Sequence, residues 1–151
     1  DGASFVGFFV RASTITARGY PDPRLFLYGD DAIYTMGLTR AGHTIGFDPS
    51  VRFEHDSSTY SSADPRIRPL WKVYYYHRNL LMLYRIAAGV FFVPVMLLYV
   101  TKWAVRVRHY PGERRRFLKL FGMALNDGLR QRTTASHAEI VAIADGKPLS
   151  E

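Results

Sequence analysis

Cysteine is absent from this chain of 151 residues, and its absence excludes whole classes of protein. Without cysteine there can be no disulfide framework and no thiolate metal site, which fits a protein of a reducing compartment. Apolar residues are abundant instead, at 48% of the chain, and aromatic residues make up 15%. This composition excludes a disordered protein, and the length suffices for one modest domain with a hydrophobic core.

Acidic residues are scarce in the middle of the chain, so the net charge of +7 is unevenly distributed. Residues 66–132 contain fourteen basic and two acidic side chains, a net charge of +12, whereas residues 1–65 carry −3 and residues 133–151 carry −2. A basic block beside apolar sequence predicts an anionic partner, either lipid head groups or nucleic acid. We expect lipid and no nucleic acid, because no nucleic-acid-binding motif accompanies the arginines.

The chain also lacks an uninterrupted apolar run of the length that a membrane-spanning helix requires. Residues 86–100 are fifteen residues without a charge, interrupted by Gly89 and Pro94, and a span needs about twenty. Basic residues flank this stretch on both sides, so a single span would leave one basic flank outside, against the positive-inside tendency. We therefore expect residues 66–132 to lie on, or re-enter, an anionic membrane surface. A core helix covered by another part of the protein is the alternative.

Three further segments have recognisable patterns. Apolar residues at helical spacing, with arginines at both ends, predict a basic amphipathic helix over residues 113–132. Residues 133–151 are expected to form a flexible polar tail. Residues 56–65 lack large apolar anchors and predict a loop, which is either a functional loop or a plain linker.

Residues 1–55 alternate between short apolar runs and helical patterns. The segments 4–11, 44–47 and 51–55 predict short strands, and the segments 12–19 and 30–42 predict helices that end at glycines. Strands that alternate with helices indicate an α/β fold, of which this stretch would be one part.

Two adjacent carboxylates, Asp30 and Asp31, follow Gly29 at the start of the second of these helices. Free backbone N–H groups and the helix dipole stabilise negative charge at that position, so a carboxylate there stays ionised, as a general base must. Capping of the helix alone is the simpler interpretation. His55 lies at the end of a predicted strand, between two acidic neighbours. An imidazole at this position can either bind a divalent metal or have a structural role.

A resemblance to a known family rests on a set of short motifs taken in order. They are Gly7-Phe8-Phe9-Val10-Arg11, Gly19-Tyr20-Pro21-Asp22, Leu25-Phe26-Leu27-Tyr28-Gly29-Asp30-Asp31, Arg40-Ala41-Gly42-His43, Pro49-Ser50, Glu54-His55, Tyr74-Tyr75-Tyr76-His77-Arg78-Asn79-Leu80-Leu81, and a closing motif of Phe121-Gly122 and Asn126-Asp127-Gly128-Leu129-Arg130. In this order and spacing, residues 2–132 resemble the C-terminal half of a family 2 glycosyltransferase, and most of all its rhamnosyltransferase-like and galactofuranosyltransferase-like members. Each motif alone is unspecific, and the ordered set carries the resemblance.

The resemblance implies a fold and a domain organisation. Residues 1–65 would be the acceptor-side part of a GT-A (Rossmann-like) catalytic domain of the α/β class, and residues 66–132 would be membrane-associated helices. The family's Asp-x-Asp motif and nucleotide-binding strands do not occur in this sequence. We therefore expect the chain to be a fragment that begins inside a domain and lacks activity by itself.

The resemblance also implies a reaction, the inverting transfer of a sugar from a nucleotide-sugar donor to a lipid-linked or cell-surface glycan acceptor. Asp31 would be the catalytic base, and Asp30 would support it or orient the acceptor. His55 would be a ligand of the divalent metal, Mn or Mg, that the Asp-x-Asp motif shares. The enzyme would work at the cytoplasmic face of the inner membrane, as a peripheral or re-entrant protein.

Substrate contacts are implied for two of the motifs. Gly7, Phe8 and Phe9 would line the acceptor side of the pocket. Tyr76 and His77 would contact the acceptor, and Arg78 would lie near the phosphates of the donor. Consecutive tyrosines cannot all share one face of a helix, so at least one of the three before His77 is expected to serve packing.

A function of a different class remains open beside the enzyme. In this alternative, residues 66–132 form a non-catalytic module that binds anionic lipid. Lipid binding would then survive the loss of Asp31 and His55.

Overall fold

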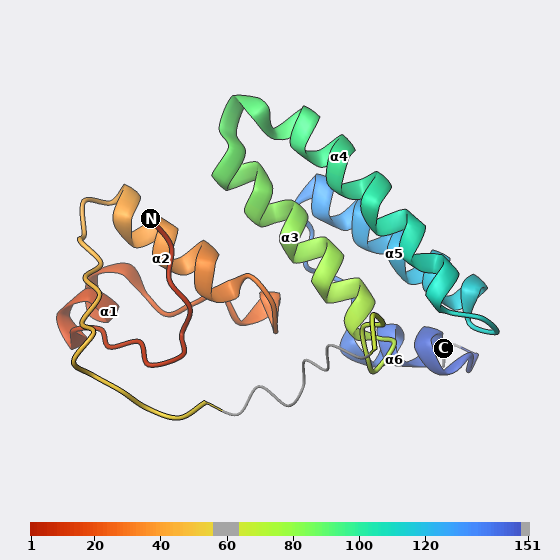
Figure 1. Ribbon diagram of the computed structural model, residues 1–151, viewed down its shortest axis with the longest axis horizontal. Coiled ribbons are helices and arrows are strands. Elements are labelled where there is room, and N and C mark those ends of the chain that lie inside the picture. The colour runs from red at the N-terminus through yellow and green to blue at the C-terminus, as the bar shows by residue number, and fades with distance from the viewer. Residues whose placement is uncertain (56–63, 149–151) are drawn as a thin grey trace.

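The computed structural model of the chain describes residues 1–55 and 64–148 (Figure 1). These residues form helices and short 3-10 turns joined by loops. In chain order they are α1 (Ala12–Arg18), η1 (Pro23–Leu25), α2 (Asp30–Arg40), α3 (Lys72–Ala88), η2 (Gly89–Phe91), α4 (Phe92–Ala104), η3 (Val105–His109), α5 (Arg114–Arg130) and α6 (His137–Asp145).

The predicted α/β, GT-A (Rossmann-like) fold is wrong for this structure, because the described residues contain helices and no strand. The segments expected as strands, 4–11, 44–47 and 51–55, are extended or irregular and pair with no neighbour within the described ranges. A strand is stable only where a partner binds its backbone N–H and C=O groups. The apolar side chains of these three segments also lack a core to pack against. For example, Phe9 and Phe47 are 84% and 90% exposed.

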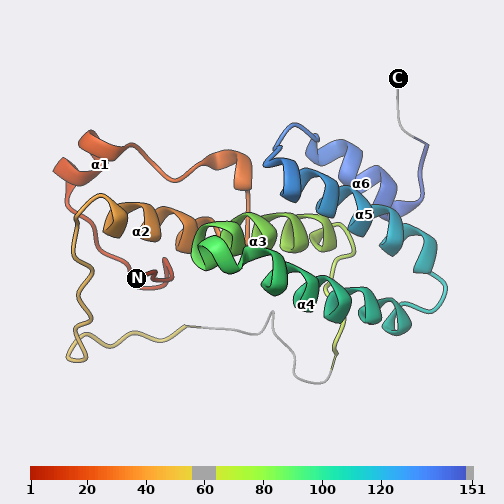
Figure 2. The ribbon, with the colours of Figure 1, turned by 90° about the horizontal axis from the view of Figure 1, so that it is seen from above.

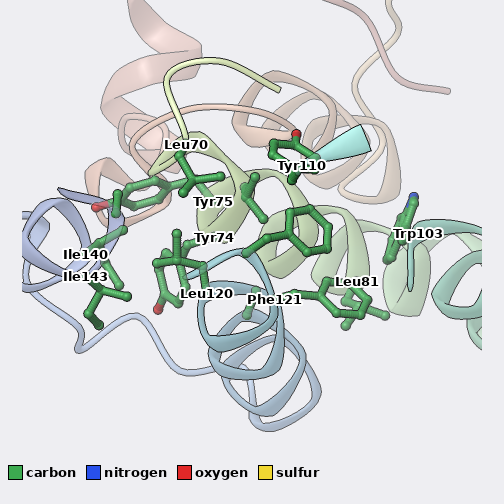
Figure 3. Packing of buried hydrophobic residues seen from close by; sticks show 14 residues of the cluster. Leu70, Tyr74, Tyr75, Leu81, Trp103, Tyr110, Leu120, Phe121, Ile140 and Ile143 are labelled. Atoms are coloured by element: carbon green, nitrogen blue, oxygen red, sulfur yellow. The ribbon is translucent and has the colours of Figure 1, made fainter. Parts of the chain in front are cut away.

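The main core surrounds α3. This helix contacts α5 more extensively than any other element, α4 returns beside it, and α2 touches it from the opposite side (Figures 1 and 2). Figure 3 shows Tyr74 and Leu120 between α3 and α5, with Ile140 of α6 on one side and Trp103 of α4 on the other. The helix expected over residues 113–132 is confirmed as α5, which buries its apolar face.

The main hydrophobic cluster draws all its members from residues 70–144. In residues 1–55 only Leu25, Thr35 and Leu38 are buried. The first segment of the chain therefore depends on α3 for its position rather than on a core of its own.

The C-terminal segment differs from the flexible tail expected over residues 133–151. Residues 137–145 form α6, whose first turn is capped by the Ser136 hydroxyl, which accepts a hydrogen bond from the Glu139 N–H at 3.2 Å. Ile140 is fully buried, so a short apolar face was enough to dock this helix on α5. The loop expected over residues 56–65 falls almost wholly outside the described residues.

Residues 72–109 form one helical segment that is long and apolar enough to cross a membrane by length and composition. Its most apolar window has a mean hydropathy of 2.1, and 11% of that window is buried. The segment is not straight, because the chain reverses at Gly89, whose φ of 52° is left-handed, and α4 returns beside α3 (Figure 1). Tyr84 stacks on Trp103 with ring centroids 5.8 Å apart, which holds the two arms together. We call residues 72–104 the apolar hairpin.

The contact between α3 and α5 depends on Gly128. A Cβ atom at this position would lie 2.9 Å from the carbonyl oxygen of Arg78 and 3.0 Å from the Cβ atom of Leu81. Both neighbours belong to the body of α3 and cannot rotate away, so the two helices approach this closely only because residue 128 has no side chain.

We predict that Gly128→Ala lowers the free energy of unfolding by about 1–3 kcal/mol, because the added methyl group forces α3 and α5 apart. Gly122→Ala is the matched control on the same helix. Its Cβ atom would meet nothing within 4 Å, so we expect a gain of about 0.5–1 kcal/mol from helix propensity. Urea denaturation of both variants checks this, and equal effects would contradict the close contact.

Candidate functional site

The two carboxylates lie in the first turn of α2, where the sequence predicts them. Gly29 precedes them in the left-handed region, with φ 77°, and its carbonyl accepts the first hydrogen bond of the helix from the Ile33 N–H at 2.8 Å. The Asp31 carboxylate accepts a hydrogen bond from the Ala32 N–H at 2.7 Å. Among the described residues, no hydrogen bond or ion pair reaches the carboxylate of Asp30. Both side chains are half-buried.

The loop that leads to these carboxylates has an unfavourable backbone conformation. Phe26 and Tyr28 have φ values of 69° and 67°, in the left-handed region that side chains with a Cβ atom avoid. Such a conformation costs about 1 kcal/mol or more per residue and persists only where surrounding contacts impose it. We call residues 24–31 the acidic loop.

Two neighbouring side chains of α3 hold the acidic loop by its carbonyl groups. Arg78 donates to the carbonyl oxygens of Arg24 and Leu25 at 2.9 and 3.1 Å. Asn79 donates to those of Leu25 and Leu27, both at 2.8 Å. The two side chains also bind each other, because Nε of Arg78 donates to Oδ1 of Asn79 at 2.7 Å. We call this arrangement the carbonyl clamp.

Arg78 is 1% exposed, so contacts with protein groups must replace the water that would otherwise stabilise its charge. Its guanidinium lies 5.1 Å from the ring centroids of both Tyr74 and Tyr75, in cation–π contact. The Tyr74 hydroxyl donates in turn to a carboxylate oxygen of Asp127 at 2.8 Å. Burial and this hydrogen bond raise the pKa of Tyr74 to about 12, so the hydroxyl keeps its proton. The structure thus places Arg78, predicted near donor phosphates, on the backbone of the acidic loop.

Aromatic side chains surround the acidic loop on the side of α3. Tyr76, one of the predicted acceptor contacts, meets Tyr28 edge to face with ring centroids 5.4 Å apart. Phe26 is 55% exposed and packs against Trp71 and His137 at 6.0 and 5.0 Å. The structure therefore brings Tyr76 to the acidic loop.

His77, the other predicted acceptor contact, is fully buried on the opposite face of α3. Its ring lies 5.0 Å from Trp103 and 4.9 Å from Phe121. Nδ1 donates to the Val73 carbonyl oxygen at 2.7 Å, and Nε2 has no partner among the described residues. Burial lowers the pKa of His77 to about 4, because the charged imidazolium would lose its hydration. His77 thus contacts the core and does not face the acidic loop.

The motif Gly7-Phe8-Phe9 lies elsewhere. It lines a hollow of about 640 Å³ between residues 3–14 and residues 43–53. Gly7, with φ 66°, is covered by the ring of Phe53, which a Cβ atom would approach to 2.0 Å. Asp30 and Asp31 do not line this hollow, so the structure keeps the predicted acceptor residues of this motif apart from the carboxylates.

His55 is exposed in the extended segment that follows α2, and it does not line the hollow either. In the part of the chain that the structure describes, no group of three or more His, Cys, Asp or Glu side chains could hold a metal ion. The described residues therefore do not make a metal site by themselves. The role of His55 as a ligand of Mn or Mg stays a prediction.

No family model, no curated protein and no solved structure matches this chain. The resemblance to family 2 glycosyltransferases therefore stays a prediction that rests on the motifs and their order. The geometry of the acidic loop is an independent observation that bears on function.

The sequence-based predictions placed Asn79 in a motif expected to pack under the site but assigned it no individual role. A physical indication was present, since Arg78 and Asn79 are adjacent polar residues that directly precede the apolar run of residues 80–83 in the helix. Polar groups buried in such a helix need hydrogen-bond partners, and the nearest backbone carbonyls are candidates. Which carbonyls they bind depends on contacts more than fifty residues apart, which periodicity cannot reveal.

We predict that the stability of the protein falls on acidification because of His77. The pKa in the folded state, about 4, lies below the ordinary value of 6.5, so protonation favours the unfolded chain. The stability that the neutral form of His77 contributes is complete above pH 6.5. It is lost progressively between pH 6.5 and 4, which lowers the free energy of unfolding by on the order of 3 kcal/mol. Thermal unfolding of the protein and of His77→Leu across this range checks this. Identical pH dependence in both proteins would show that His77 does not titrate as its burial requires.

Proposed function

We propose that this chain is the acceptor-side part of an inverting glycosyltransferase that works at a membrane surface. It would move a sugar from a nucleotide-sugar donor to a lipid-linked or glycan acceptor. The observation that carries the proposal is the pair Asp30-Asp31 at a helix N-terminus, held by the carbonyl clamp against the apolar hairpin. The proposal rests on this site and on the order of the motifs, and not on an α/β fold.

The chemistry requires a base for the acceptor hydroxyl. The acceptor oxygen attacks the anomeric carbon, the bond from that carbon to the diphosphate oxygen breaks, and the hydroxyl proton passes to the base. Asp31 suits this role, because it lies in the first turn of α2 and one carboxylate oxygen remains after the bond to the Ala32 N–H. Asp30 would orient the acceptor through a second hydroxyl.

Membrane association is supported by the apolar hairpin. At its tip Val90 is 91% exposed and Phe91 is 68% exposed, and Leu98 on the outer face of α4 is 66% exposed. A contiguous apolar surface of this kind indicates a protein or membrane interface. The basic side chains at its flanks, Arg85 and Lys102 among them, suit anionic lipid. We propose that the hairpin tip enters one leaflet from the cytoplasmic face of the inner membrane, as a peripheral or re-entrant element.

The same surface favours a second candidate function, a non-catalytic module that binds anionic lipid through residues 66–132. Both candidates require lipid binding, and only the first requires the carboxylates. Variants of the acidic loop and of the hairpin tip therefore distinguish them.

We predict that Asp31→Asn, in the protein expressed from its native reading frame, lowers sugar transfer by about 10²–10⁴-fold, because the amide cannot accept the proton. Release of nucleoside diphosphate from a panel of nucleotide sugars, with membrane lipid extract as acceptor, measures this. Asp145→Asn, an exposed change on α6, is the control and should keep full activity. Full turnover in Asp31→Asn removes Asp31 as the base. If the unmodified protein releases no nucleoside diphosphate from any donor, the lipid module replaces the transferase.

We predict that Phe91→Glu combined with Leu98→Glu lowers binding to phosphatidylglycerol vesicles by more than about tenfold, because each apolar side chain contributes about 1.5–3 kcal/mol on burial. Flotation of the protein with vesicles measures this. Phe47→Glu is the matched control, since Phe47 is 90% exposed but lies in the first segment of the chain. Equal losses in both variants, or none in either, would contradict insertion of the hairpin tip.

A further inference from the structure

We propose that Arg78 and Asn79 are positioning residues that set the orientation of Asp30 and Asp31 through the carbonyl clamp. The inference rests on the proposed function, since it assigns these residues a part in the reaction of that site. Neither side chain is expected to touch the substrate, because both are buried beneath the acidic loop. Their action would pass through the backbone.

The clamp acts close to the carboxylates. The carbonyl groups of Leu25 and Leu27 are both held, so the peptide plane that precedes Phe26 and the one that precedes Tyr28 are fixed. Only Tyr28 and Gly29 separate the last held carbonyl from Asp30, and both are left-handed. The carbonyl clamp therefore sets the direction in which α2 starts. It thereby also sets the orientation of the first two side chains of α2, Asp30 and Asp31.

The chemistry of the clamp explains why these two residue types are present. In Arg78 the nitrogen Nη2 donates to two successive carbonyls while Nε donates to Asn79, so one planar group reaches the loop and Asn79 together. A lysine ammonium on a flexible stem does not reproduce this arrangement. Asn79 supplies two further donors on one nitrogen and an acceptor for Nε of Arg78. Together they hold three carbonyls of the acidic loop with side chains of adjacent residues.

The clamp also leaves the catalytic carboxylates unpaired. A buried guanidinium usually requires a carboxylate in direct contact, and the acidic loop that Arg78 binds ends at Asp30 and Asp31. In the described residues its direct partners are instead carbonyl oxygens, the Asn79 amide and the hydroxyl of Tyr74, behind which lies Asp127. The charge of Arg78 is thus balanced without neutralising Asp30 or Asp31, which stay available to bind an acceptor and take its proton.

The second end of α2 is tied to the same helix. Arg40, the last residue of α2, donates to the carbonyl oxygen of Ile86 near the end of α3. About ten residues of helix, or roughly 15 Å, separate Asn79 from the reversal at Gly89. The two carboxylates are therefore held at a set distance from the tip of the apolar hairpin, as a transferase acting on a membrane-bound acceptor requires.

Amide hydrogen exchange of the full chain tests the clamp without any substrate. Asn79→Ala removes two donors, and we expect exchange of the amides in the first turn of α2 to accelerate more than tenfold, with the amides of α5 unchanged. Asn79→Asp is the second variant, because it keeps the size of the side chain and gives Arg78 a carboxylate partner but cannot donate to the carbonyls. Thr134→Ala, an exposed polar change in the loop after α5, is the control and should change neither region.

Kinetics of nucleoside diphosphate release then test the catalytic consequence. Misplaced carboxylates should lower kcat by about 10–100-fold in Asn79→Ala and Asn79→Asp and leave KM for the nucleotide sugar unchanged. Unchanged exchange in the first turn of α2 overturns the clamp, and so does acceleration that spreads equally through α3 and α5. A loosened turn with unchanged kcat overturns the positioning role. If the parent protein transfers no sugar, the proposed function fails, and the exchange result alone decides whether the clamp orients the turn.

Discussion

The burial of three consecutive polar residues in α3 is the constraint on which the rest of the structure depends. His77, Arg78 and Asn79 are all removed from water, and each needs contacts that offset the loss of hydration. His77 faces α5 and remains neutral among aromatic rings, whereas Arg78 and Asn79 turn to the other side and bind the acidic loop. A single turn of α3 therefore contacts the core through His77 and the candidate site through Arg78 and Asn79.

This arrangement explains how a first segment with almost no core of its own is positioned. Residues 1–55 bury few side chains, yet the loop before α2 and the last residue of α2 are both held by hydrogen bonds with α3. Hydrogen bonds from buried charged or amide groups are worth more than exposed ones, because water does not compete for them. Order at the carboxylates is thus obtained from polar contacts rather than from apolar packing.

The apolar hairpin gives the same helix a second feature that bears on the proposed function. One end of α3 supports the acidic loop, and the other ends in a reversal whose apolar side chains face outward. A soluble core would bury such residues, so their exposure indicates an interface, which the proposed function assigns to lipid. Catalysis and membrane attachment would then be coupled mechanically, since both depend on one continuous helix.

Local patterns in the sequence were enough to predict α1, α2 and α5, because helix periodicity and the residues at helix ends act within a few positions. The same patterns predicted strands that do not form among the described residues, since a strand depends on a partner elsewhere in the chain. They placed Asp30 and Asp31 at a helix start for the same local reason. What only the tertiary structure decided is the reversal at Gly89, the docking of α6 and the carbonyls that Arg78 and Asn79 bind. Each of these joins distant residues, and a pairing of that kind is set by which groups are buried together, not by the residues beside them in the chain.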